Sequence, residues 1–171
     1  NTQNDSSDCL RLTLENTKRL FIWAVDGSDV GAVIIKPTLN LQPNVWNHVV
    51  WTFQYTGTTG TGGIYINGVF TESGTRTSYT QRQSGNFKAI FSNNGNTSFD
   101  SARVWNRVLT AAEIANIYFN NIVPRNGLVA EYLFNEASGS TALDTSGNGN
   151  DGTITGATYT LGVPLKLRNE V

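Results

Sequence analysis

Hydrophobic and polar residues alternate with a period of two in several short stretches of the chain. In Leu10 to Leu14 the three leucines share one face and the polar residues share the other, which is typical of a half-buried strand. Arg19 to Val25 follows after a short polar turn and is closed by Asp26-Gly27. These two segments together predict a β-hairpin.

The same reasoning predicts further strands along the chain. Asn67-Gly68 is the strongest turn signal, because both residues tolerate the positive φ of a type I′ hairpin. Gly57 to Gly63 holds only Thr and Gly, so we expect a mobile connection there. The other predicted strands are Val30 to Ile35, Val45 to Phe53, Gly63 to Phe70, Phe87 to Phe91, Ser101 to Arg107, Gly127 to Phe134 and a short one near Ala157 to Leu161.

One segment has helical character. Thr110 and Glu113 have the spacing of a capping box, in which each side chain hydrogen-bonds the backbone N–H of the other residue. Ile114 and Ile117 then repeat at helical spacing, and Pro124 lies just beyond the expected end. The pattern predicts one short helix near residues 110–120.

Many short strands with Gly- and Asn-rich turns, and only one helix, predict an all-β fold built as an antiparallel two-sheet β-sandwich. A length of 171 residues suits one ordinary domain, so we expect residues 1–171 to form a single domain. Because the chain begins at Asn1 and shows no signal-peptide pattern, we expect a mature product or a piece of a longer protein.

Charge and hydropathy exclude some classes of partner. The formal net charge is −1, which gives no field to attract nucleic acid or an anionic membrane surface. The apolar stretches are far shorter than the roughly 20 residues that cross a bilayer, so we expect no membrane insertion. Only 15% of residues are charged, and the single cysteine cannot form an internal disulfide. This composition favours a β-protein of the cell exterior.

Several blocks of the sequence resemble one family. Trp46 to Phe53 with Gly63 to Gly68 is similar to its "W-H-V-A-x-T-Y … x-L-Y-V-N-G" hairpin, and Ala102 to Ile114 is similar to its "V-R-V-Y-N-R-A-L-S-x-x-E-I" strand and helix. Gly127 to Glu136 with Asp144 to Gly152 resembles its opening strand and "D-x-S-G-N-G-N-D-G" loop. The family is the laminin-G-like, concanavalin A-like lectin/glucanase group. The resemblance implies a jelly roll of the non-catalytic type.

The order of these blocks departs from the family, because the block that normally opens the domain here follows the helix that normally ends it. Three explanations remain open. They are a circular permutation within one domain, a boundary between two tandem domains near 122–127, and completion of the sandwich by a strand from another chain. The single compact domain is the interpretation we favour.

Catalytic chemistry is not expected. His48 is the only histidine, and it lies within a predicted strand, so a structural role is expected for it. Glu131 and Glu136 are the nearest approach to the carboxylate pair of a glycosidase, but their odd spacing places them on opposite faces of a strand. We therefore predict that the protein is not an enzyme.

The loop from Asp144 to Asp151 is rich in oxygen ligands of the kind that Ca²⁺ prefers. Related jelly-roll domains often hold calcium near such loops, and the predicted ligands of a structural Ca²⁺ are Asp144, Asn148 and Asp151. The alternative is that Asx and Gly residues only build a tight turn.

The predicted function is extracellular recognition of a glycan or glycoprotein through loops at the edge of the sandwich, at a cell surface or virion surface. Aromatic rings stack on sugars, and amide and guanidinium groups bind hydroxyls. The alternative function is a structural, assembly or decoration domain of a virion, fibre or cell-surface filament that binds neighbouring protein subunits. A glycoside hydrolase is a third and weaker interpretation. The predicted ligand-binding residues are Tyr55, Arg76, Tyr79, Arg82, Asn93, Asn94 and Asn96.

Overall fold

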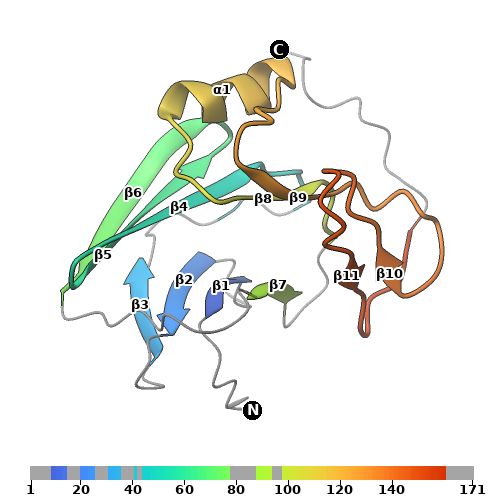
Figure 1. The fold of residues 1–171 in the computed structure, drawn as a ribbon, viewed down its shortest axis with the longest axis horizontal. Coiled ribbons are helices and arrows are strands. Elements are labelled where there is room, and N and C mark those ends of the chain that lie inside the picture. Colours follow the sequence, from blue (N-terminus) through green and yellow to red (C-terminus); the bar gives the residue numbers. More distant parts are fainter. Residues whose placement is uncertain are drawn as a thin grey trace. The chain divides into compact units, whose positions relative to one another are not determined.

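The computed structural model describes residues 9–14, 20–25, 31–35, 41, 44–77, 88–93 and 98–160 (Figure 1). The chain divides into two compact units, Asn1–Thr97 and Ser98–Val171, called here the N-terminal and C-terminal units. The described residues are mostly β, with mainly antiparallel pairing and one helix, as predicted.

A sheet of the N-terminal unit contains the strands β3-β2-β1-β7 in that order. Their bounds are Cys9–Leu14 for β1, Leu20–Val25 for β2, Gly31–Ile35 for β3 and Lys88–Asn93 for β7. Strands β1 and β2 pair antiparallel in a continuous register, which confirms the predicted hairpin. Strand β7 runs parallel to β1 on its other edge.

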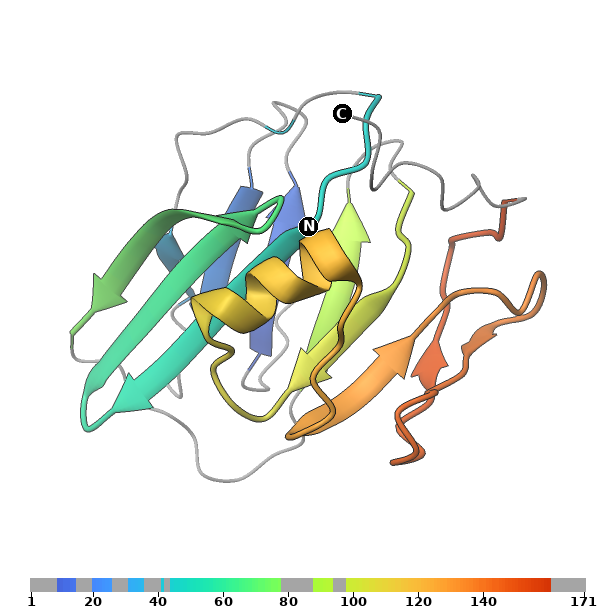
Figure 2. The same ribbon diagram turned by 90° about the horizontal axis from the view of Figure 1, so that it is seen from above.

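The second sheet of this unit is an antiparallel meander of β4 (Val49–Thr56), β5 (Thr59–Ile66) and β6 (Val69–Arg76), seen side by side in Figure 2. The turn between β5 and β6 is formed by Asn67 at φ 52° and Gly68 at φ 79°. Two consecutive positive φ angles are the requirement of a type I′ turn, so the turn prediction is confirmed.

The mobile connection expected at Gly57 to Gly63 is wrong, because all but its first two residues belong to β5. Gly63 is needed there for close packing. A Cβ atom at Gly63 would lie 3.0 Å from the Thr52 hydroxyl oxygen and 3.5 Å from the Phe70 ring. Glycine inside a strand often marks such a close approach. The low strand propensity of the stretch is therefore overridden by its neighbours.

The two faces of the β4–β5–β6 sheet differ in burial. Ile64 is fully buried and Ile66 is buried on the same face, while Thr61 on the opposite face is exposed. The Cα atoms of strand β3 lie close to those of β5 and β6. The face with Ile64 and Ile66 is thus the core face of this sheet.

The C-terminal unit contains β8 (Ala102–Trp105), α1 (Ala111–Asn120), β9 (Leu128–Tyr132), β10 (Thr141–Ala142) and β11 (Gly152–Thr153). Strands β8 and β9 pair antiparallel, and so do β10 and β11 (Figure 2).

Helix α1 begins and ends as the sequence predicts. The Thr110 hydroxyl accepts the Glu113 N–H, and the Glu113 carboxylate accepts the Thr110 N–H at 2.8 Å, so the capping box is present. Ile114 and Ile117 are buried. Asn121 adopts a left-handed conformation and its N–H donates to the Asn116 carbonyl, which closes the helix C-terminus.

The segment between α1 and β9 is held close to β8. The Trp105 Nε1–H donates to the Pro124 carbonyl at 2.9 Å, and the Asn106 N–H donates to the Gly127 carbonyl at 2.9 Å. A Cβ at Gly127, which has φ +74°, would lie 2.7 Å from the Asn106 side-chain oxygen. This connection therefore requires glycine, and it directs β9 into register beside β8.

The short strand predicted near Ala157 to Leu161 is wrong for its described residues, 157–160, which have no regular secondary structure. The Tyr159 hydroxyl donates to Glu136 at 2.8 Å and contacts the Thr141 carbonyl at 3.1 Å. Side-chain contacts thus attach this segment in place of a backbone ladder. The short strand of the region is β11 instead.

Candidate functional site

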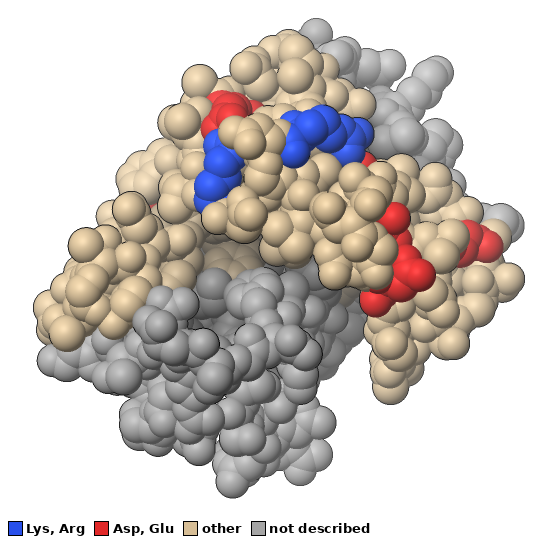
Figure 3. Space-filling view, viewed as in Figure 1, with Lys and Arg blue, Asp and Glu red and all other residues tan. Residues whose placement is uncertain are grey.

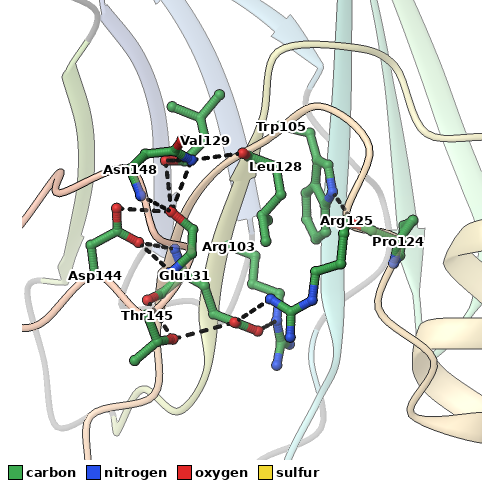
Figure 4. A network of polar contacts seen from close by, with 11 residues as sticks. Arg103, Trp105, Pro124, Arg125, Leu128, Val129, Glu131, Asp144, Thr145 and Asn148 are labelled. Atoms are coloured by element: carbon green, nitrogen blue, oxygen red, sulfur yellow. Dashed lines mark hydrogen bonds and ion pairs between the residues drawn. The ribbon is translucent and has the colours of Figure 1, made fainter.

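The strongest polar cluster of the C-terminal unit centres on the carboxylate of Glu131, which is only 4% exposed (Figure 4). Arg103 Nε donates to one carboxylate oxygen at 2.8 Å, and Arg125 donates to the other at 2.6 Å. Burial raises the pKa of Glu131, but the hydrogen bonds and charges of the two arginines lower it by more. Glu131 is therefore a buried carboxylate that stays ionised.

The secondary structure explains this cluster. Arg103 on β8 and Glu131 on β9 are direct partners in the antiparallel register, so their side chains share a face. Arg125 comes from the connection that precedes β9, and its side chain is 65% exposed. Thr145 adds a contact from the following loop, 3.3 Å from Glu131.

The loop from Asp144 to Asp151 folds around the carboxylate of Asp144. One oxygen accepts the backbone N–H of Glu131 at 2.9 Å and of Ser146 at 2.8 Å. The other accepts the Asn150 N–H at 2.9 Å and the Ser146 hydroxyl at 2.9 Å. Burial raises the pKa of Asp144, and these hydrogen bonds outweigh it and lower the pKa to about 2.

The asparagines of this loop bind the backbone of β9. The Asn148 side-chain amide donates to the Leu128 and Val129 carbonyls, both at 3.0 Å, and the Asn150 amide donates to the Val129 carbonyl at 2.9 Å. The Ser146 hydroxyl reaches the same carbonyl at 3.1 Å. The loop therefore supplies donors to backbone carbonyls of β9, and most of them go to Val129, which has no partner in the β8–β9 register.

The residues predicted to bind calcium are brought together in this loop, where hydrogen-bond donors surround the carboxylate of Asp144. Both oxygens of Asp144 face hydrogen-bond donors, and one oxygen of Asp151 accepts the Asp144 N–H at 2.8 Å. Across the described part of the chain, no three His, Cys, Asp or Glu residues group as metal ligands. Ca²⁺ needs six to eight oxygen ligands. Calcium stays a prediction, and these contacts favour the alternative of a hydrogen-bonded Asx turn.

Glu131 and Glu136, the nearest approach to a catalytic pair, both serve internal contacts. Glu136 accepts the Leu143 N–H and the Tyr159 hydroxyl, each at 2.8 Å. Burial raises the pKa of Glu136, and its hydrogen bonds lower it below the ordinary value. A general acid of a glycosidase needs a raised pKa.

His48 is tied to the β5–β6 turn through its backbone. The His48 N–H donates to the Asn67 side-chain oxygen at 2.9 Å, and the Asn67 N–H donates to the His48 carbonyl at 2.8 Å. The imidazole is half-buried. These contacts agree with the structural role expected of this histidine.

Two of the predicted ligand-binding residues lie in one row of the sheet. Tyr55 on β4 and Arg76 on β6 both pair with Gly60 of β5. Tyr55 is half-buried. Asn93 is the last residue of β7. Four of the predicted residues lie outside the described part of the chain, namely Tyr79, Arg82, Asn94 and Asn96.

A surface that the sequence reasoning missed is the face of β4–β5–β6 opposite Ile64, called here the hydroxyl face. Its signal is the period-two pattern of β5, in which Thr59, Thr61, Gly63 and Tyr65 alternate with Gly60, Gly62, Ile64 and Ile66. Its polar members are Thr52, Gln54, Thr56, Thr59, Thr61, Ser73 and Thr75, and Val50, Gly63, Tyr65 and Phe70 complete it.

The comparisons with known proteins bear on the fold. The family model described as "Concanavalin A-like lectin/glucanases superfamily" matches residues 2–115, well over half of the chain. The search of curated proteins found no match. A solved structure of an S-layer domain-containing protein (residues 221–444) from Clostridium thermocellum ATCC 27405 has a TM-score of 0.29 and 17% identity. That match covers 60% of this chain and 57% of the solved one.

The family model spans β1 to β8 and ends within α1, so it confirms the resemblance stated for the blocks before residue 115. The block from Gly127 to Gly152 lies outside the match. None of the helices in the described residues has both the length and the apolar character to traverse a bilayer. The chain belongs to the concanavalin A-like lectin/glucanase superfamily.

Proposed function

We propose that this chain is a non-catalytic extracellular recognition module that binds a glycan or glycoprotein. The two sheets of the N-terminal unit would form the layers of a jelly-roll sandwich, since β3 lies close to β5 and β6. The superfamily includes both lectins and glucanases, so the choice between binding and hydrolysis depends on the carboxylates.

The observation that carries the proposal is that three carboxylates of the C-terminal unit are engaged in contacts within the protein. Glu131 is held by two arginines, Asp144 by four donors, and Glu113 by Arg107. Their pKa values all lie below the ordinary ones. A glycosidase requires one carboxylic acid that is protonated near its working pH. These three carboxylates instead stabilise the fold, which supports binding.

The residues predicted to bind the ligand are proposed to contact it. They were expected in loops, but Tyr55 and Arg76 lie within the strands β4 and β6. The test is a glycan array probed with the full chain, with calcium and with a chelator. We expect retention on a glycan, and loss of retention in the variants Tyr55→Ala, Tyr79→Ala or Asn94→Ala. No retention on any glycan under either condition would contradict the proposed function. Retention in the presence of the chelator would show that calcium is not required.

A second function is favoured by the apolar residues exposed in each unit. Val69 and Phe70 in the N-terminal unit and Phe119 and Ile122 in the C-terminal unit are each more than half exposed. Exposed apolar groups often mark protein contacts. An assembly or decoration domain at a cell or virion surface would use them against neighbouring subunits. Size-exclusion chromatography with light scattering tests this, and a monomer at all concentrations would contradict self-assembly.

A further inference from the structure

We infer that the hydroxyl face of β4–β5–β6 binds an uncharged glycan. This inference rests on the proposed function and goes beyond it, because it moves the site from the edge loops to a sheet face and specifies the charge of the ligand. The face was defined above by its residues, and most of its polar members are exposed.

The strand register arranges these side chains in rows. Gln54, Thr61 and Thr75 form one row across the three strands, and Thr52, Gly63 and Ser73 form the next. Direct partners in antiparallel strands project to the same face, and each row is about 10 Å across at ordinary strand spacing. The rows therefore present hydroxyl and amide groups over an area that suits several sugar hydroxyls.

An aromatic pair closes one end of the face. Tyr65 and Phe70 are direct partners across β5 and β6, and their rings meet edge to face with centroids 5.3 Å apart. Phe70 is 53% exposed, and its ring lies over Gly63, where an added Cβ would come within 3.5 Å of it. An exposed ring beside a flat backbone segment can stack on the apolar C–H side of a sugar.

The charge of the face identifies the class of ligand. Along the described residues of β4, β5 and β6, every position on this face is neutral, and Glu72 pairs with Ile64 on the opposite face. On the face of the molecule drawn in Figure 3, the blue and red side chains lie over the C-terminal unit. A polyanion would need cationic side chains to bind here. Threonine hydroxyls both donate and accept hydrogen bonds, as sugar hydroxyls do, so a neutral glycan is the complementary partner.

The experiment compares the full chain with three variants on an array of neutral and anionic polysaccharides. Phe70→Ala removes the exposed ring, and Thr61→Lys places a charge in the central row. Phe119→Ala is the matched control, because Phe119 is 54% exposed and meets Tyr118 edge to face at 4.8 Å. We expect affinity for neutral glycans to fall about tenfold in Phe70→Ala and Thr61→Lys, and to stay unchanged in Phe119→Ala.

The outcomes separate this inference from the proposed function. Glycan binding that survives in both test variants would overturn the hydroxyl face as the site and leave the proposed function intact. Tighter binding to anionic than to neutral glycans would overturn the charge assignment. No binding to any glycan by the parent chain would overturn both. If Phe70→Ala loses its native circular dichroism spectrum, Thr61→Lys at an exposed position carries the test.

Discussion

Replacing Glu131 with glutamine tests the buried charge cluster most sharply. The substitution keeps the shape of the side chain and removes its negative charge. Arg103 is left with only 12% of its side chain exposed and without its ionic partner. Removing one partner of a buried ion pair costs about 3–5 kcal/mol.

The expected loss lies at the lower end of that range. Arg125 is 65% exposed, so water can solvate it when the carboxylate is gone, and its share is below about 1 kcal/mol. The amide oxygen of the introduced glutamine can still accept one hydrogen bond from Arg103. We therefore expect Glu131→Gln to lower the free energy of unfolding by about 3 kcal/mol.

Urea unfolding followed by circular dichroism measures this change, with the slope m expected to stay constant. The matched control is Glu113→Gln, which breaks the Arg107 pair but leaves the capping box able to form. That pair is more exposed, with 27% and 28% of its side chains accessible, so its loss should be smaller. A Glu131→Gln variant no less stable than the Glu113→Gln control would refute the reasoning.

Three further predictions concern the C-terminal unit. Gly127→Ala should lower the free energy of unfolding by about 1–2 kcal/mol more than Gly147→Ala. Both glycines have positive φ, but only at Gly127 would the added Cβ lie within 3 Å of another atom, the Asn106 side-chain oxygen. Equal losses in urea unfolding would contradict this. The pKa of Asp144 is lowered from 3.8 to about 2, so its contribution to stability is complete above pH 3.8 and lost as the pH falls to about 2. In an acid titration, the free energy of unfolding should therefore fall less over this range in Asp144→Asn than in the parent. A chelator should leave the melting temperature unchanged if hydrogen bonds hold the Asp144 loop, and a rise in melting temperature on adding calcium would instead support the metal prediction.

Local signals in the sequence predict the elements that depend on neighbouring residues. The Thr110/Glu113 capping box and the Asn67-Gly68 turn need only a few residues to form, and both are present where the pattern places them. The β1–β2 hairpin is also local, because its two strands are neighbours in the sequence. Fold class follows from these elements together.

Contacts between distant residues could not be predicted in the same way. Glu131 meets Arg103 across 28 residues, and only the β8–β9 register brings them together. The glycine-rich composition of β5 misleads the prediction, because Gly63 admits the Thr52 and Phe70 side chains, which no local propensity reveals. The sequence singles out Asp144 as a candidate calcium ligand. The backbone N–H groups that donate to its carboxylate are brought there only by the folded backbone.

Binding without hydrolysis is the central claim, and one measurement tests it directly. The full chain is incubated with an immobilised polysaccharide that retains it, and both the bound protein and the reducing sugar ends released into solution are measured over time. The account predicts stable retention with no new reducing ends. Steady release of reducing ends would show that the chain cleaves the glycan and would contradict the account.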